Sequence, residues 1–423
     1  MPLLQLLRLK TTLLTTLLVL PGICAAAEPI LWPIEGHFPA YPTEFPEDAF
    51  DILLRVGGTY DDNFLRLSAT ETPPPILEGD KAVASGHAGG GFDFRTGASL
   101  QRFRVQAMVD QYWYEGLTFL DHLRHQGDAS WQWAIGDALT GEMVYSNSRS
   151  LADFGDLQEP IKDLVSRQYA YVSAGFSILP VWRLRAAVSG SQFEHSEVTR
   201  QHLDQNIKQG TAGFEFGKVA SNTFGVQYSI SEGWYPNRDN FTPLVPLDDR
   251  YKQYEGTAIL KLNIGADSHL DLGVGHTRRV HEDLSIRDFS GITGHANLQL
   301  APTNKVLLLL NVYREVQSAE DLAASYIVAD GVSFGPAWAP TLKSVLQFEL
   351  VYEKRSLEGD PDVVSGVEVV QSDITRTARV SGGYSPTDGL QFVARYEFGN
   401  RSSSFEPLTY DYNSAGLDVV FRF

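Results

Sequence analysis

The C-terminal stretch Ala415-Gly-Leu-Asp-Val-Val-Phe-Arg-Phe423 decides the fold, because its side chains alternate between two different faces. One face of an extended strand carries only apolar residues: Ala415, Leu417, Val419, Phe421 and Phe423. The other face carries Gly416, Asp418, Val420 and Arg422. A soluble β-sandwich also alternates, but ending on an aromatic residue is typical of a barrel strand that faces lipid on one side and the lumen on the other. The stretch predicts a transmembrane β-barrel whose assembly signal is Leu417, Val419, Phe421 and Phe423.

The N-terminal residues have the features of a secretory signal. Arg8 and Lys10 precede an apolar core that is too short to cross a membrane, and Ala25-Ala-Ala27 is a small-residue cleavage site. The residues that follow are rich in proline, which prevents a long helix, so we expect an extended leader. A periplasmic docking segment or a partial plug of the pore is the alternative for this leader. The predicted divisions are a signal peptide over 1–27, a Pro-rich periplasmic leader over 28–50 and the barrel over 51–423.

The composition favours strands and tight turns. The 423 residues include 37 Gly, 18 Tyr and 23 Phe, and the formal net charge is -18. This acidic balance argues against nucleic acid as a partner. Cleavage after Ala27 would remove Cys24, the one cysteine of the chain, so we expect no disulfide in the mature protein.

Alternating segments recur about every 20 residues, which suits membrane strands of ~9–11 residues plus their connections. The clearest segments are 52–60, 102–110, 182–189, 255–264 and 390–398. Short turns, such as the one expected at 335–338, alternate with long polar loops, such as the one expected over 115–126. The predicted fold class is therefore all-β, an antiparallel barrel of about 18 strands with short periplasmic turns and long extracellular loops. A β-propeller is the alternative, but no blade motif recurs in the sequence.

The polar faces of these segments carry too many charges for a dry core, and a barrel of this size has room for water. Two interpretations follow. The charges form cross-strand ladders that stiffen the wall, or they line a hydrated pore in which arginine pairs attract acidic groups on a solute. Lys343 is assigned to the same inward face. The candidate lumen-lining residues are Arg102, Arg104, Arg183, Arg185, Lys261, Glu349, Arg379, Arg395, Glu397, Asp418 and Arg422.

Catalytic and metal-binding patterns do not stand out. The sequence contains no Gly-x-Ser-x-Gly motif, no Walker loop and no dinucleotide-binding fingerprint. His276 is assigned to the lipid face, without a fixed acidic partner. His122 and His125 are assigned to a loop, and two ligands at that spacing do not define a metal site. We expect no enzymatic activity, no cofactor and no metal.

Several stretches resemble the EpsL-type outer-membrane proteins that are encoded in exopolysaccharide operons. They are Tyr60-Asp-Asp-Asn-Phe-Leu-Arg-Leu67, Ser99-Leu-Gln-Arg-Phe-Arg104, Tyr112-Trp-Tyr with Leu120-Asp-His, and Trp131-Gln-Trp-Ala-Ile-Gly-Asp-Ala-Leu-Thr-Gly141. The resemblance is clearest from Tyr60 to Asp156. It implies a porin-like barrel of exosortase/PEP-CTERM-associated polysaccharide loci and brings no catalytic residues. The matching positions near Tyr60 lie where a strand meets its loop, so we also expect them to cap that strand.

The resemblance implies a role in exopolysaccharide biosynthesis or export across the bacterial outer membrane. Two alternatives remain: a general small-solute porin, and a structural or adhesive barrel without transport activity. The expected partners are outer-membrane lipid and lipopolysaccharide, the barrel-assembly machinery, exopolysaccharide and periplasmic export components, with no nucleic acid.

Overall fold

The computed structural model describes residues 49–217, 222–238, 250–265, 267–282, 288–318, 326–358 and 371–423. The predicted signal peptide and nearly all of the Pro-rich leader lie outside the described residues. Among the described residues, no helix is long and apolar enough to cross a membrane.

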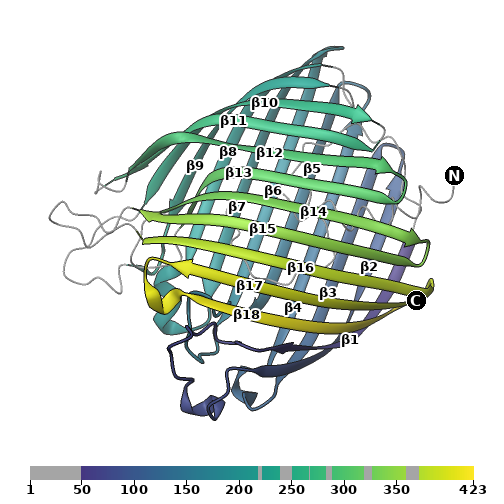
Figure 1. Ribbon diagram of the computed structural model, residues 1–423. Coiled ribbons are helices and arrows are strands. Elements are labelled where there is room, and N and C mark those ends of the chain that lie inside the picture. Colours follow the sequence, from purple (N-terminus) through teal and green to yellow (C-terminus); the bar gives the residue numbers. More distant parts are fainter. Residues whose placement is uncertain are drawn as a thin grey trace.

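Eighteen antiparallel strands form one closed sheet, in which each strand pairs with the next along the chain and β1 pairs with β18 (Figure 1). The prediction of about 18 strands in a transmembrane barrel is confirmed. The strands are β1 (Ala49–Asp61), β2 (Val83–Ala98), β3 (Gln101–Tyr114), β4 (His122–Ile135), β5 (Leu139–Leu151), β6 (Leu164–Leu179), β7 (Trp182–His195), β8 (Gln205–Gly217), β9 (Thr223–Trp234), β10 (Tyr251–Gly265), β11 (Ser268–His281), β12 (Phe289–Thr303), β13 (Val306–Ser318), β14 (Tyr326–Thr341), β15 (Ser344–Glu358), β16 (Gln371–Thr387), β17 (Leu390–Ser403) and β18 (Tyr410–Arg422).

The two ends of the barrel differ. Short turns connect β2 to β3, β4 to β5 and the other even–odd pairs at the end where the C-terminus lies, and longer loops connect the strands at the opposite end (Figure 1). Within the described parts of the long loops there are short 3-10 helices: η1 (Pro75–Leu77), η2 (Thr118–Leu120), η3 (Val198–Leu203) and η6 (Glu406–Leu408). In outer-membrane barrels the short turns are periplasmic and the long loops extracellular.

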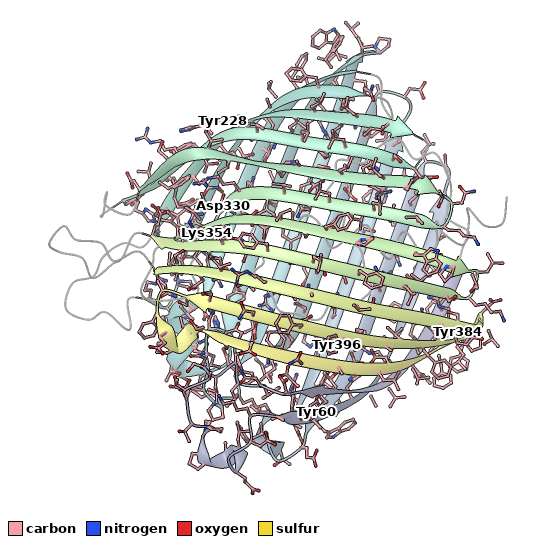
Figure 2. All side chains as sticks on the ribbon, viewed as in Figure 1. Tyr60, Tyr228, Asp330, Lys354, Tyr384 and Tyr396 are labelled. Atoms are coloured by element: carbon pink, nitrogen blue, oxygen red, sulfur yellow. The ribbon has the colours of Figure 1, made fainter. Side chains whose placement is uncertain are left out.

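Alternation along each strand separates an apolar outer surface from a polar interior. In β18, Leu417 and Phe423 point outward and are 55% and 70% exposed, whereas Asp418 between them is only 3% exposed. Outward tyrosines occur on widely separated strands, and Figure 2 shows four of them: Tyr60, Tyr228, Tyr384 and Tyr396. Such a distribution is stable when lipid surrounds the barrel and water or protein fills its interior.

Two of the predicted local boundaries are wrong. Residues 335–338 do not form a turn but belong to β14, which runs on to Thr341. Pro336 has no N–H to donate; it is registered with Leu308 of β13, while the register with β15 skips from Phe334 to Ala337. His122 and His125 lie on β4 rather than in a loop. The strands are 12 to 17 residues long and extend beyond the predicted ~9–11 toward the long loops.

The barrel closes between its first and last strands. Residues from Leu53 to Asp61 are registered with Arg422 back to Ser414. Beyond this register, the Ile52 N–H donates to the Phe423 carbonyl and the Phe423 N–H donates to the Ile52 carbonyl, both at 3.0 Å. Phe423 therefore contributes both backbone pairing and an outward aromatic side chain at the periplasmic edge.

Deletion of Phe423 is expected to reduce the amount of folded barrel in the outer membrane. The deletion removes two backbone hydrogen bonds, each worth about 0.5–1.5 kcal/mol, together with the aromatic end of the assembly signal. Heat-modifiable migration on a gel measures the folded fraction. Phe423→Tyr, which keeps the backbone and the ring, is the matched control and should fold normally. Equal folded amounts of the deletion variant and the control would contradict the assembly role.

Candidate functional site

The inward charges of β1, β2, β3, β17 and β18 form a paired network. The Arg55 guanidinium lies 2.6 Å from a carboxylate oxygen of Asp110. Asp418 accepts from Arg395 and lies 2.8 Å from Nε2 of His87. Gly57 makes room for this contact, because a Cβ at its position would lie 2.1 Å from Asp418 Oδ1 and 2.8 Å from His87 Cε1.

A second group of paired charges lies on β15, β16 and β17. The Arg379 guanidinium bridges Glu349, at 3.0 Å, and Glu397. The Tyr412 hydroxyl of β18 also donates to Glu397. A separate pair joins β2 and β3, where Arg104 lies 3.2 Å from Asp93. These contacts join neighbouring strands and match the geometry of a stiffening ladder.

The remaining candidate residues are distributed over the wall. Arg183 donates to Thr140, Arg185 pairs with Glu215, and Lys261 lies 3.6 Å from Asp271. Arg102 is registered with Gln132 of β4. Arg422 is exposed at the short-turn end of β18. Contact of any of these residues with a solute stays a prediction.

Lys343, which was assigned to the inward face, lies instead in the exposed turn between β14 and β15. Its ammonium donates to the carbonyl of Pro386, at the end of β16, at 2.6 Å. The reason for the error is the boundary of β14, because the strand ends later than the sequence pattern suggested.

An uncharged polar surface on β5 to β9 was not predicted. At its centre the rings of Tyr169 and Tyr171 stack with centroids 6.4 Å apart and an interplanar angle of 11°. Both side chains alternate with the outward residues Ala170 and Val172, so they face the lumen. Serine, threonine and glutamine side chains surround them in register on the neighbouring strands: Ser146, Ser189, Ser191, Gln209, Thr211, Ser229 and Ser231.

This tyrosine wall, defined as Tyr169, Tyr171 and those seven neighbours, differs in chemistry from the paired charges of β1 to β3 and β15 to β18. Its side chains present hydroxyl and amide groups, as in the 2.9 Å hydrogen bond between Thr211 and Ser229. One indication of this surface was present in the sequence, the serines at alternate positions of β5 and β7. Alternation predicts that such serines face the lumen, but it does not predict what they bind.

Three long loops pack together over the extracellular mouth. Their apolar side chains form a buried mouth cluster with the ends of β2 and β3: Leu65, Leu67, Leu77, Val83, Tyr112, Tyr114, Leu117, Leu120 and Phe154. The cluster joins the β1–β2, β3–β4 and β5–β6 loops, so part of the mouth is filled by protein rather than by water.

The β5–β6 loop, residues 152–163, also reaches the opposite wall. Asp156 pairs with Arg401 of β17 and lies 3.6 Å from Arg355 of β15, which is nine strands from β6 in either direction around the ring. Arg401 additionally donates to the Gly155 carbonyl at 2.9 Å and to Asp373 of β16 at 2.7 Å. The loop therefore spans the mouth and is held at its far side by ion pairs.

The charge of Asp156 is maintained by these arginines. Burial alone would raise the pKa of the carboxyl group, but the nearby Arg355 and Arg401 guanidinium groups outweigh this effect and lower the pKa to about 2. Asp156 is thus ionised throughout the physiological pH range, and the ion pairs across the mouth persist.

The Tyr60–Leu67 stretch, which carries the resemblance stated above, forms the junction between the first strand and its loop. Asp62 accepts from the backbone N–H of Asn413 at 2.6 Å and from its side-chain amide at 2.7 Å. Arg66 donates to both carboxylate oxygens of Asp61 and lies 3.5 Å from the centre of the Tyr412 ring. These contacts support the expected structural cap on β1, extended to β18.

His276 was considered as the base of a catalytic site. His276 is on the outer face, and its Nε2 lies 3.3 Å from the Ser290 hydroxyl. A serine nucleophile needs a base held by a third polar group, but the positions opposite His276 are Gly256 and Ile292. Within the ranges that the structure describes, no group of three or more His, Cys, Asp or Glu side chains could hold a metal.

A closed ring of 18 strands with an apolar outer surface and a polar interior defines this protein as a porin-like β-barrel of the bacterial outer membrane. No protein-family model matches the sequence, and no curated protein is similar enough to be identified as a relative.

Solved structures that resemble it are outer-membrane barrels. OccAB3 of Acinetobacter baumannii has a TM-score of 0.45 at 11% identity, covering 88% of this chain and 99% of its own. The outer membrane protein OpdK of Pseudomonas aeruginosa has 0.44 at 11%, covering 90% and 100%. The alcaligin outer membrane receptor FauA of Bordetella pertussis has 0.39 at 12%, covering 90% and 77%. Similarity at this level is confined to general architecture, so nothing about a solute follows from it.

Proposed function

We propose that the barrel conducts uncharged segments of an exopolysaccharide across the outer membrane. The tyrosine wall is the observation that carries this proposal. Tyr169 and Tyr171 are partly exposed on the lumen side, and their stacked rings form one aromatic surface bordered by hydroxyl and amide groups. No charged side chain belongs to this set of nine residues; the charged residues that border it are Arg167, two residues before Tyr169 on β6, and Glu142, which is registered with Ser173 two residues after Tyr171.

Sugar chemistry fits such a surface. The C–H faces of a pyranose ring are apolar and pack against an aromatic ring, while its hydroxyls exchange hydrogen bonds with serine, threonine and glutamine side chains. The opposite wall adds little net field, because Arg55, Arg379 and Arg395 each have a carboxylate partner. This balance favours uncharged over acidic sugars.

A general small-solute porin is the second candidate, and the β5–β6 loop favours it. The loop spans the mouth and is held by Arg355 and Arg401 on the far wall. A narrowed mouth suits small solutes better than a polymer. Deleting the protein separates the two functions: an exporter leaves polymer trapped in the periplasm, whereas a small-solute porin leaves secretion of the polymer unchanged.

Replacing both Tyr169 and Tyr171 with Ala is expected to weaken binding of a neutral glucose oligomer in the channel. Each lost aromatic contact costs about 0.5–1.5 kcal/mol, so the apparent dissociation constant should rise about five- to a hundredfold for the pair. Oligomer-induced current blockades in planar bilayers give this constant. An acidic uronic-acid oligomer should block weakly in both proteins.

The matched control is Tyr145→Ala, which removes an outward tyrosine of β5 that is 47% exposed on the outer surface. The neutral glucose oligomer should block the channel of this variant with the same apparent dissociation constant as the channel of the unmodified protein. A loss of affinity equal in the control and the double variant, or stronger block by the acidic oligomer, would overturn the proposal for uncharged sugar.

A further inference from the structure

Four charged residues form a patch on the outer surface, away from the lumen. This rim patch consists of Arg314 on β13, Asp330 on β14, Lys354 on β15 and Arg376 on β16. Their side chains point outward, because each is two residues along its strand from an outward apolar or aromatic residue: Val312, Val332, Tyr352 and Ala378. A solute inside the barrel cannot reach them.

The rim patch is continuous across four strands. Arg314, Asp330 and Lys354 are directly registered with one another on neighbouring strands. Arg376 is registered with Tyr352, two residues before Lys354, and is therefore a diagonal neighbour of that lysine. The four side chains thus cover one compact area of the wall.

The patch carries excess positive charge in a chain that is acidic overall. The Arg314 guanidinium lies 2.9 Å from Asp330, with side chains 49% and 42% exposed. Arg376 donates to the neutral amide of Asn400 at 3.0 Å. Within the described residues Lys354 forms no ion pair. Three cations therefore face one carboxylate, so the patch has two positive charges that the wall does not neutralise.

The level of the patch is the edge of the membrane on the side of the long loops. On β14, the outward residues beyond Asp330 are apolar as far as Trp338: Val332, Phe334, Pro336 and Trp338. Figure 2 shows Asp330 and Lys354 together at the long-loop end of the wall, and Tyr384 toward the opposite end. With the long loops extracellular, the patch meets the headgroups of the outer leaflet.

We propose that the rim patch binds the phosphate groups of a phosphorylated glycolipid of the outer leaflet, the lipid A portion of lipopolysaccharide. Arginine guanidinium groups bind phosphate through paired N–H donors, and lysine adds a mobile point charge. Outward cations at the headgroup level attract anionic lipid, whereas water or solute in the lumen has no access to them. The acyl chains of the lipid would lie along the apolar residues below.

A strand of the same wall, three strands from β13, provides a contrast near its long-loop end. Lys252 of β10 is also exposed on the outer face, but its ammonium lies 3.3 Å from Glu282 and it is registered with Glu232 of β9. This lysine therefore carries no excess charge toward the lipid. It is a matched control, since it is an outward cation at the rim whose charge the protein already neutralises.

The test uses the full-length protein folded in neutral detergent with EDTA present, so that divalent ions cannot bridge acidic groups to phosphate. Binding of purified lipid A is measured by native mass spectrometry, in parallel with lipid A from which the phosphates have been removed. The variants are Arg314→Gln, Lys354→Gln and Arg376→Gln combined, and Lys252→Gln alone. Heat-modifiable migration verifies that each variant is folded.

We expect the unmodified protein and Lys252→Gln to retain lipid A and to lose at least tenfold in binding when the phosphates are removed. The triple variant should bind both lipids equally weakly. Unchanged binding of lipid A by the folded triple variant, or unchanged binding after dephosphorylation, would overturn the proposal. If the triple variant does not fold, Lys354→Gln alone, which breaks no ion pair among the described residues, is measured against Lys252→Gln by the same criteria.

Discussion

Replacing Asp156 with Asn is expected to release the β5–β6 loop from the far wall and to raise single-channel conductance. The substitution keeps the size of the side chain but removes the charge that Arg355 and Arg401 bind. Arg401 keeps its 2.7 Å contact with Asp373, so the barrel wall should remain intact. The effect should therefore concern the mouth and not the fold.

The size of this effect follows from the lost contacts. A hydrogen bond to a charged group contributes about 1.5–3 kcal/mol, which would shift the ratio of attached to released loop by about ten- to a hundredfold. The Asp156 side chain is 37% exposed, so solvent screening places the shift toward the lower value. Glu159→Gln, which neutralises an exposed acid of the same loop, is the control and should leave conductance unchanged. Equal conductance of Asp156→Asn and this control would show that the loop does not restrict the channel.

The same contacts define a pH dependence. The pKa of Asp156 in the folded protein is lowered to about 2, below the ordinary value of 3.8. The stabilisation is therefore present above pH 3.8 and is lost as the pH falls through about 2. Conductance of the unmodified channel should show no opening of the mouth between pH 8 and pH 4. An increase of conductance within that range would contradict the assignment of Asp156 as the attachment point.

Replacing Asp418 with Ala is expected to cause the largest loss of stability among single substitutions in the barrel wall. Asp418 is 3% exposed and is the carboxylate partner of both His87 and Arg395. Removing one partner of a buried ion pair costs about 3–5 kcal/mol, because the remaining charge is left without compensation. The temperature at which heat-modifiable migration changes should fall markedly.

Two further variants separate ion pairing from other effects of substitution. Asp411→Ala removes an exposed acid of the same strand and should be close to neutral. Combining Asp418→Leu with Arg395→Met replaces the pair by apolar side chains and should recover part of the lost stability. Full stability of Asp418→Ala would show that the network is not structural and would restore the alternative in which these charges serve a solute.

The fold could be predicted from the sequence because membrane strands obey a local rule. Alternation in β18, β1 and β17 assigns each side chain to lipid or lumen without knowledge of its partners. The rule failed at Pro336, since proline and glycine usually mark turns, and here the strand continues through a gap in one of its two ladders. The strands also continue further toward the long loops than the sequence predicted. The reason is that polar residues beyond the membrane remain in register with the neighbouring strands.

The candidate site was predicted less completely than the fold, because some of its contacts join residues that are far apart in the sequence. Arg395 and Asp418 are 23 residues apart on neighbouring strands, so their pairing was anticipated as a ladder. Asp156 and Arg401 are 245 residues apart and meet only because a loop spans the mouth. No local pattern contains such a contact. The tyrosine wall was missed for a different reason, because neutral polar residues give no signal beyond their alternation.

The junction between the first and last strands has a consequence for the order of folding. Neighbouring strands elsewhere are joined by connections along the chain, whereas Asp62 and Asn413, which hold β1 to β18, are 351 residues apart. The entropic cost of closing a loop increases with its length, so hairpins can form early and this junction forms only when all the intervening strands are in place. Until then β1 and β18 expose unpaired edges that would pair with other chains. The contacts of Asp62 with Asn413 therefore form in the last step of folding, in which an aggregation-prone open sheet closes into a barrel.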